Sequence, residues 1–467
     1  MRYTRFRYSF VLPLVICTLL FAGCSLFGDN TSPGKGTNAP PANHQASSSP
    51  AATVTNPAVK TVELDILNNI KTYGFNSDRQ FNDGLGGLWV NWRYGTSPLQ
   101  TNVNGTGETD AASGADPRHD PLTDLRYLHA LWLYKSQNPG DNSFEGEITR
   151  YTPIVKAEFK NSHNERGWLY DEFVDLYNLS HDSFYKDTAS SLAAGFSKSF
   201  DSDIGTIYKP NSSGHDQGSY RVDTALEAGC ALVEAGSLFN KPQWTQEGLS
   251  TIKFIYDHAY IAQYHIFPDQ MDNVLDANGA ANPHEQFFLG TSTSNGGSYA
   301  VKGAQTQMGN ISQMVTSLLA VYQVTHTQDF LNKATDLLNT LSLPNNSLGL
   351  WDSSNGGYYF AAAFSGDSPA QPGSVTIVKS KKEAGRQAIM LQAFHIANKY
   401  TNDKYRDMEN RMLDVALNHL YSAPMHGVLY LTNADWTPQK FKNGTLNNMV
   451  TTEAMGAELE SLFSLKS

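Results

Sequence analysis

The chain has 467 residues, of which 40% are hydrophobic, 11% aromatic and only 17% charged. This length suits one large domain or two domains of ordinary size. The formal net charge of -11 excludes the basic surface that binding to nucleic acid or to an anionic membrane would require. The three cysteines form neither a CxxC pair nor a Cys/His cluster, so the sequence offers no ligand set for structural zinc.

The first 23 residues have the pattern of a secretory signal peptide. A basic segment, Met1–Tyr8, precedes an apolar run of twelve residues, Phe10–Phe21. As a helix, this run would rise about 18 Å, whereas the apolar core of a bilayer is about 30 Å thick. Residues 1–23 are therefore expected to be a signal peptide and not a membrane-spanning helix.

Cys24 follows the small pair Ala22-Gly23, and this arrangement resembles a bacterial lipobox. The resemblance implies cleavage before Cys24 and attachment of lipid to its thiol. The alternative is ordinary secretion with an incidental cysteine. Residues 24–58 are rich in Ser, Pro and Asn, and are expected to be a disordered tether. Residues 59–467 would then form the folded domain, with Cys230 as a small core residue.

Helical spacing of apolar residues recurs along the predicted domain, between loops rich in Gly, Asn, Ser and Pro. The pattern predicts helices with approximate bounds 60–73, 121–136, 146–160, 167–180, 182–198, 220–237, 241–261, 303–324, 327–342, 380–399, 402–421 and 450–465. If the last helix pairs with the first, these helices form an all-α (α/α)6 toroid, which is a closed ring of six helical hairpins around one core. The alternative is an open solenoid of stacked hairpins.

The long connections between hairpins are expected to lie on one face of this toroid. The first helix of each hairpin would be an inner helix, so that its first turn meets the long loops at that face, where function is usually found. The candidate substrate-binding residues there are Trp89, Trp92, Asp120, Trp168, Tyr170, Tyr220, Arg221, Gln307, Trp351, Arg386 and Trp436. The tryptophans suit stacking on sugar rings, although they could instead form local cores of the loops.

Carboxylates at or near the first turns of the inner helices are the candidate catalytic groups. They are Asp171, Glu172, Asp223, Glu383 and Glu453. Cleavage of a glycosidic bond needs two carboxyl groups, one ionised and one protonated. A helix N-terminus favours the ionised form, which suits a nucleophile or base. Acids in these places can also serve only as helix caps, and adjacent residues such as Asp171 and Glu172 point about 100° apart on a helix.

The stretch Tyr170-Asp171-Glu172, followed by Leu176-Tyr177 and Phe184-Tyr185, resembles the Tyr-Asp-Asp helix of the family 76 α-1,6-mannanases and related transglycosidases. The resemblance implies that Asp171 is the nucleophile and Glu172 the acid. This sequence departs from the family pattern in having a glutamate at the second acidic position.

A second group of residues resembles the C-terminal half of N-acylglucosamine 2-epimerase-like proteins. It comprises Trp351-Asp352, Gly356–Phe360, Lys382-Glu383, Arg386 and Thr451–Gly456. This resemblance implies proton transfer by histidines, for which His284, His395 and His426 are the candidates. The epimerase alternative therefore predicts two histidines that face each other in the pocket.

The sequence as a whole predicts a lipid-anchored, extracytoplasmic glycoside hydrolase or transglycosidase that acts on a polysaccharide. The expected protein is a monomer that uses no cofactor and no metal, does not bind nucleic acid, and meets the membrane only through Cys24. The alternatives are an epimerase-like sugar isomerase and a glycan-binding lipoprotein without catalytic activity. Two carboxyl groups within about 5–10 Å of each other in an open cleft would favour the hydrolase.

Overall fold

The computed structural model describes residues 56–77, 82–97, 99–101, 120–160, 166–207, 219–273, 287–288, 293–294, 297–298, 305–343, 345, 347–365, 372–440 and 448–466. The residues from Thr53 onward belong to one compact unit. The predicted signal peptide, Cys24 and nearly all of the predicted tether lie outside the described residues, as does His284.

The structure confirms the predicted helices. The inner helices are α2 (Pro121–Gln137), α4 (Trp168–Ser180), α6 (Val222–Leu238), α8 (Met308–Thr325), α10 (Ala384–Tyr400) and α12 (Thr452–Ser464). The outer helices are α1 (Pro57–Asn69), α3 (Glu145–Phe159), α5 (Ser183–Lys198), α7 (Pro242–His258), α9 (Gln328–Leu341) and α11 (Arg406–Val415). The helices α1 and α11 continue into the π-helical turns η1 (Ile70–Gly74) and η4 (Ala416–Leu420). The described residues also include the short 3₁₀ turns η2 (Asn82–Gly84) and η5 (Ala423–Met425).

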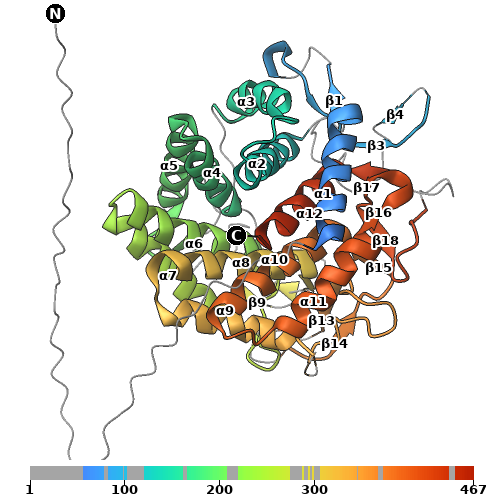
Figure 1. Ribbon diagram of the computed structural model, residues 1–467. Helices are drawn as coiled ribbons and strands as arrows, with labels where there is room; N and C mark the ends of the chain where they lie inside the picture. The colour runs from blue at the N-terminus through green and yellow to red at the C-terminus, as the bar shows by residue number, and fades with distance from the viewer. Residues whose placement is uncertain are drawn as a thin grey trace, which may run out of the picture. The chain divides into compact units, whose positions relative to one another are not determined.

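The inner helices form a closed ring, so the toroid is confirmed and the solenoid alternative is wrong. Each inner helix packs against the next, and α12 returns to pack against α2 and against α1. Figure 1 shows α12 in red beside α1 in blue, although they come from opposite ends of the chain. A solenoid would leave these two ends apart.

Burial separates the two layers of helices. In α6, every residue from Val222 to Gly236 is buried, as expected for a helix that is surrounded on all sides. The outer helix α9 instead buries one stripe at helical spacing, which includes Phe330, Ala334, Leu337 and Leu341. Cys230 is buried in α6, as predicted.

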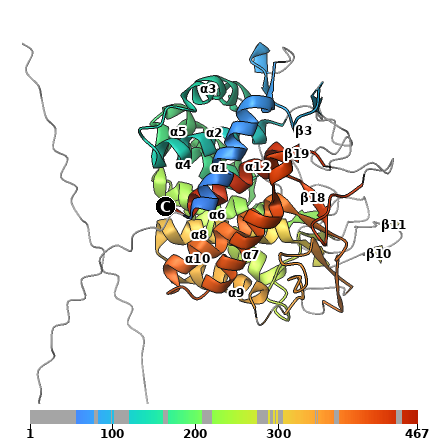
Figure 2. The same cartoon turned by 45° about the vertical axis from the view of Figure 1, so that its right-hand side comes forward.

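Short antiparallel strands fasten the long connections to the first turns of the inner helices. The strands that directly precede inner helices are β7 (Ser219–Arg221), β12 (Gln305–Gln307), β15 (Lys381–Glu383) and β19 (Val450–Thr451). Their partners are β8 (Gln270–Asn273), β13 (Ala361–Phe364), β18 (Leu431–Asn433) and β3 (Asn91–Arg93). The side of the ring that carries these strands is called the loop face below. Figure 2 shows β3, β18 and β19 on this side and the C-terminus on the other.

The remaining strands extend these sheets or form two-stranded hairpins. They are β1 (Phe75–Asn76), β2 (Gly87–Leu88), β4 (Gln100–Thr101), β5 (Phe200–Asp201), β6 (Thr206–Ile207), β9 (Phe287–Phe288), β10 (Thr293–Ser294), β11 (Gly297–Ser298), β14 (Val375–Ile377), β16 (Tyr421–Ser422) and β17 (Gly427–Val428). Among the helices of the described ranges, none combines the length and apolar character needed to cross a bilayer.

Candidate active site

A cavity of about 460 Å³ lies among the six inner helices and is called the axial cavity below. It reaches the last turns of α2, α10 and α12, where Gln137, Lys399 and Ser464 line it. The side chain of Asp175, which also lines it, is 59% exposed. The axial cavity therefore extends toward the ends of the inner helices that lie away from the loop face.

The structure places Asp171 and Glu172 in this cavity, and not at the loop face where they were predicted. The reason is the depth at which α4 begins. Gly167, which precedes α4, packs against Glu227 in the second turn of α6, and a Cβ at Gly167 would lie 2.2 Å from the backbone carbonyl carbon of Glu227. The first turn of α4 consequently lies deeper in the ring than the first turn of α6.

Both adjacent acids line the cavity, but they meet different neighbours. The side chain of Asp171 is hydrogen-bonded to Glu234 of α6. Burial raises the pKa of Asp171 to about 8, and repulsion by Asp175 and Glu227 acts in the same direction. The expectation that the helix N-terminus keeps this carboxyl ionised is therefore wrong, because desolvation outweighs the helix dipole. At neutral pH the Asp171–Glu234 pair holds a proton.

Glu172 faces two cations of α2. Its Oε1 lies 3.5 Å from Nε of Arg126, whose guanidinium is stacked 4.3 Å from the centre of a Trp168 ring. His129 lies beside it and donates from Nδ1 to Glu460 of α12 at 3.1 Å. Burial opposes the charged imidazole, but the contact with Glu460 and the nearby acids raise the pKa of His129 to about 9. Burial raises the pKa of Glu172 well above its usual value, and the charge of Glu460 acts in the same direction, although Arg126 and His129 oppose the shift. The two cations therefore stabilise negative charge on the Glu172–Glu460 pair as a whole.

Several buried polar atoms of the cavity have no hydrogen-bond partner among the described residues. The donors are Nε and Nη1 of Arg126, and the acceptors are Oε2 of Glu172 and Oε1 of Glu234. Buried polar groups are normally satisfied, and each exception needs an explanation. A ligand rich in hydroxyl groups, which both donate and accept, would satisfy all of them. Trp168 and the amide side chains of Gln313 and Gln392 complete a lining of this kind.

The other predicted acids form a separate cluster at the loop face. Asp223 accepts from Arg221 at 2.8 Å and from Arg166 at 3.3 Å. Burial opposes its ionisation, but these two guanidinium groups hold the pKa of Asp223 below its usual value.

Across the ring, Arg386 lies between Glu383 and Glu453, at 3.3 and 3.6 Å. Burial and the charge of Glu453 raise the pKa of Glu383, and Arg386 opposes the shift. Gln307, also predicted to bind substrate, donates its backbone N–H to Asp269. The predicted set of five carboxylates is therefore divided between two sites, with Asp223, Glu383 and Glu453 at the loop face.

Glu227 lies between the two groups. Its carboxylate is 3.9 Å from Arg166 and interacts electrostatically with both Asp171 and Arg386. Burial raises its pKa to about 7, although Arg166 acts against the shift. Glu227 thus connects the charged residues at the loop face with those in the axial cavity.

Several predicted substrate-binding aromatic residues belong to the core instead. Trp92, Tyr170 and Tyr220 are at most 2% exposed, so they have no surface to offer a sugar ring. Strand pairing explains two of them: Trp92 is paired with Val450 in β19, and Tyr220 with Met271 in β8.

The remaining predicted residues have other roles or other surroundings. Asp120 caps α2 by accepting from the N–H of Leu122. Trp89 is half-buried against the core. Trp168 alone of the predicted tryptophans lines the axial cavity, whereas Trp351 and Trp436 line a different groove, which is described below.

The residues that complete the cavity were not among those predicted from the sequence. They lie beyond the first turns of their helices, and they are Arg126, His129, Asp175, Glu234 and Glu460. The spacing of polar residues on two helices could have identified some of them. Arg126 and His129 are three residues apart in α2, and Asp171 and Asp175 are four residues apart in α4, on helices that are otherwise largely buried. Such spacing places them on one inward face.

A metal ion would have one candidate set of ligands in the described part of the chain. His129, Glu172 and Glu460 bring potential ligand atoms within 4.8 Å of one another. Arg126 lies 3.5 Å from Glu172 and 4.0 Å from Glu460, so a guanidinium already supplies positive charge there. These residues therefore do not fit a divalent ion well.

The histidines of the epimerase alternative lie elsewhere. His395 is bound to Glu409 of α11, and His426 is bound to Asp65 of α1. Of the described residues that line the axial cavity, only His129 is a histidine. Two facing histidines are thus not found among them.

No protein-family model matches the sequence, and no curated protein matches it. Three solved structures illustrate what the fold is similar to. An unsaturated glucuronyl hydrolase specific for heparin is 14% identical, with a TM-score of 0.57 over 88% of this chain and 96% of its own. A D-mannose isomerase is 12% identical, with a TM-score of 0.52 over 87% of this chain and 99% of its own.

The third is an inactive variant of an α-1,6-mannanase from Salegentibacter, with two consecutive aspartates replaced by asparagine, in complex with α-1,6-mannotriose. It is 13% identical, with a TM-score of 0.51 over 87% of this chain and 98% of its own. At such identities the likeness concerns the fold. The chain is a six-hairpin (α/α)6 toroid, with the architecture of these carbohydrate-active proteins.

Proposed function

We propose that the protein is a glycoside hydrolase that binds its glycan in the axial cavity. The observation that carries this proposal is the lining of the cavity. It combines a protonated carboxyl pair, a second carboxyl pair whose charge cations stabilise, and buried donors and acceptors that have no partner among the described residues. Hydrolysis of a glycosidic bond needs both protonation states of a carboxyl group in one site.

The protonation states suggest a role for each pair. Asp171, which carries a proton at neutral pH, would transfer it to the glycosidic oxygen as the bond to the anomeric carbon breaks. The Glu172–Glu460 pair, whose negative charge Arg126 and His129 stabilise, would supply the carboxylate that attacks the anomeric carbon or activates a water molecule. This role of Asp171 as the acid differs from the role of nucleophile that the family 76 resemblance implies for it.

The similar structures support the involvement of two consecutive acids and suggest the first substrate to test. In the α-1,6-mannanase variant, the replacement of two consecutive aspartates accompanies loss of activity, and α-1,6-mannotriose is bound. Asp171 and Glu172 are likewise consecutive acids in this chain. We therefore propose a polysaccharide substrate, with α-1,6-mannan as the first candidate.

The test measures new reducing ends after incubation with a panel of polysaccharides that includes α-1,6-mannan. We expect Asp171→Asn to lower the rate about 10²- to 10⁴-fold, because the proton donor is lost. Asp187→Asn is the matched control, since Asp187 is exposed on the outer helix α5. Equal rates in the parent and in Asp171→Asn would contradict the assignment. Binding without release in the parent would favour the non-catalytic glycan-binding alternative.

We also propose that the chain is exported from a bacterial cytoplasm and held at the cell membrane by lipid on Cys24. The support is the basic and apolar leader that ends in Ala22-Gly23-Cys24. When the full chain is expressed in a bacterium, we expect it to partition into the detergent phase and Cys24→Ala to remain in the aqueous phase. Detergent partitioning that is unaffected by Cys24→Ala would contradict lipidation at this residue.

A further inference from the structure

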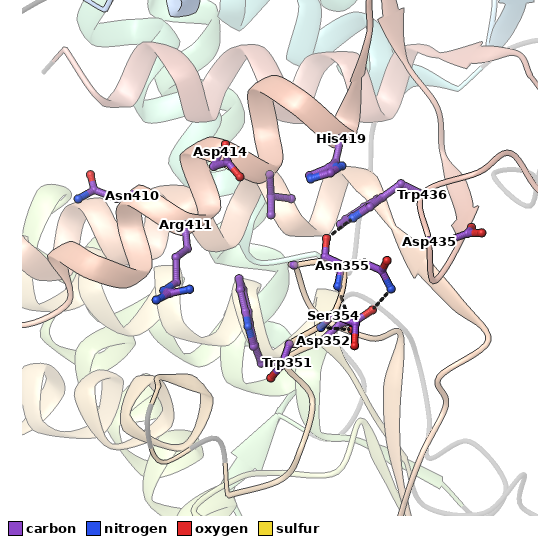
Figure 3. Close-up of a pocket in the computed structure, with 13 residues that line it drawn as sticks. Trp351, Asp352, Ser354, Asn355, Asn410, Arg411, Asp414, His419, Asp435 and Trp436 are labelled. Atoms are coloured by element: carbon purple, nitrogen blue, oxygen red, sulfur yellow. Dashed lines mark hydrogen bonds between the residues drawn. The ribbon is translucent and has the colours of Figure 1, made fainter.

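A second groove lies outside the ring of inner helices, between α11 and the turn that follows α9. It has a volume of about 630 Å³ and shares no lining residue with the axial cavity. Figure 3 shows Asn410, Asp414 and His419 along the side formed by α11 and η4, and Trp351 and Asn355 on the opposite side. We call this feature the α11 groove.

The turn that forms one wall of the α11 groove is held rigidly. Asp352 accepts from the backbone N–H groups of Ser354 and Asn355 at 3.0 and 3.3 Å, and from Nζ of Lys382 at 2.9 Å. Lys382 is completely buried and also donates to the carbonyl of Gly356 at 2.6 Å. A buried ion pair contributes little net stability compared with apolar packing. Its clear effect here is to fix the shape of the wall.

Trp436, which also lines the α11 groove, is held in a fixed orientation as well. Its backbone has φ = 66°, in the left-handed region that residues other than glycine seldom adopt. The indole N–H donates to the carbonyl of Asn355 at 2.8 Å, and the ring lies 4.3 Å from Nζ of Lys382. His419 stacks on this ring at 5.3 Å with an interplanar angle of 15°. Strained backbone of this kind persists where the surroundings dictate it, and it clusters at ligand sites.

The composition of the groove identifies the kind of ligand. The half-buried His419–Trp436 stack offers aromatic surface to the C–H face of a sugar ring, and Trp351, which is only 6% exposed, forms part of the wall. Asn410 both donates and accepts, and Asp414 accepts from hydroxyl groups. The charge of Arg411 is balanced by Asp407 at 2.8 Å, so the rim offers no free cation to an anionic ligand.

The protonation of His419 agrees with this description. Burial lowers its pKa, and the charge of Lys382 acts in the same direction, although Asp414 opposes the shift. The imidazole is therefore neutral at pH 7 and adds no positive charge to the groove.

We propose that the α11 groove is a second carbohydrate-binding site, which holds a neutral glycan chain away from the axial cavity. Its walls are ordered before binding, so little conformational entropy is lost when a sugar enters. A site of this kind keeps a polymer at the surface of the protein. The proposal concerns binding only and does not depend on hydrolysis in the axial cavity.

The test is affinity electrophoresis of the full chain in detergent, through gels that contain one polysaccharide each. The neutral probes are α-1,6-mannan, dextran and galactan, and the anionic probe is polygalacturonate. All proteins carry Asp171→Asn, so that the probes are not degraded. The groove variant is Asn410→Ala with Asp414→Ala, since both residues are exposed on α11. The control is Asp329→Ala with Asn332→Ala, which removes the same side chains from the exposed face of α9.

We expect at least one neutral polysaccharide to retard the protein. The groove variant should bind it about tenfold more weakly, because two hydrogen-bonding side chains are lost. Equal retardation of the groove and control variants would overturn the proposal, as would no retardation by any neutral probe. Stronger retardation by polygalacturonate than by every neutral probe would overturn the assignment to neutral glycans. Retardation in these gels, together with no release of reducing ends by the parent protein that retains Asp171, would contradict only the proposed hydrolase.

Discussion

Asp171 lies in the first turn of α4, where free backbone N–H groups favour a charged carboxylate. Burial nevertheless raises its pKa to about 8, because the desolvation of the carboxylate in the axial cavity outweighs the stabilisation that the helix N-terminus provides. The identity and spacing of the two acids could be read from the sequence. Their protonation could not, since it depends on how deeply α4 enters the ring and on Glu234, which lies 63 residues further along the chain.

The pH dependence of the reaction tests this protonation state. If Asp171 is the proton donor, kcat/KM falls as the pH rises through about 8, where the acid loses its proton. Asp175 and Glu227 are the negative groups that raise this pKa, and Glu234 shares a hydrogen bond with the acid. Asp175→Asn removes one repulsive charge, so the alkaline limb of the profile should move to lower pH.

The control for this measurement is Asp187→Asn, which leaves the cavity unchanged. An alkaline limb that stays in place in Asp175→Asn would show that another group controls it. A limb that moves to higher pH would contradict the electrostatic account of Asp171.

At the scale of elements, the helices could be predicted because apolar residues recur at helical spacing in both layers. The start of α2 was predicted closely, because Asp120 caps the helix and Pro121 opens it. The predicted helices 303–324 and 380–399 began too early, since the strands β12 and β15 occupy the residues just before α8 and α10. The relative depth of the helices could not be predicted. This depth is determined by close contacts between helices, such as that of Gly167 with Glu227. The spacing of apolar residues along the sequence contains no information about such contacts.

Gly167 therefore offers a test of how α4 is placed. A methyl group there would lie 2.2 Å from the Glu227 carbonyl carbon, so Gly167→Ala must displace α4. We expect a loss of about 1–3 kcal/mol in the free energy of unfolding, measured by urea denaturation, together with weaker activity. Gly146→Ala in α3 is the control, because a Cβ there meets nothing within 4 Å and should be neutral or stabilising. A Gly167→Ala protein as stable and active as the parent would contradict this role.

At the scale of the whole molecule, ring closure could be inferred from the helix count and from the unpaired first and last helices. The functional site was also predicted on the loop face, because long loops often carry function. In the structure, charged residues lie both at the loop face and in the axial cavity. The axial cavity, which contains Asp171 and Glu172, extends away from the loop face. The order of elements determines the ring, whereas packing inside the ring determines where a cavity remains.

The location of the bound glycan tests the central claim most directly. We would determine the crystal structure of Asp171→Asn with an oligosaccharide that the parent hydrolyses. The account predicts a sugar ring in the axial cavity, beside Trp168 and within hydrogen-bond distance of Glu172 and Arg126. A sugar bound instead at the loop face, over Asp223 and Arg386, with nothing in the axial cavity, would contradict it.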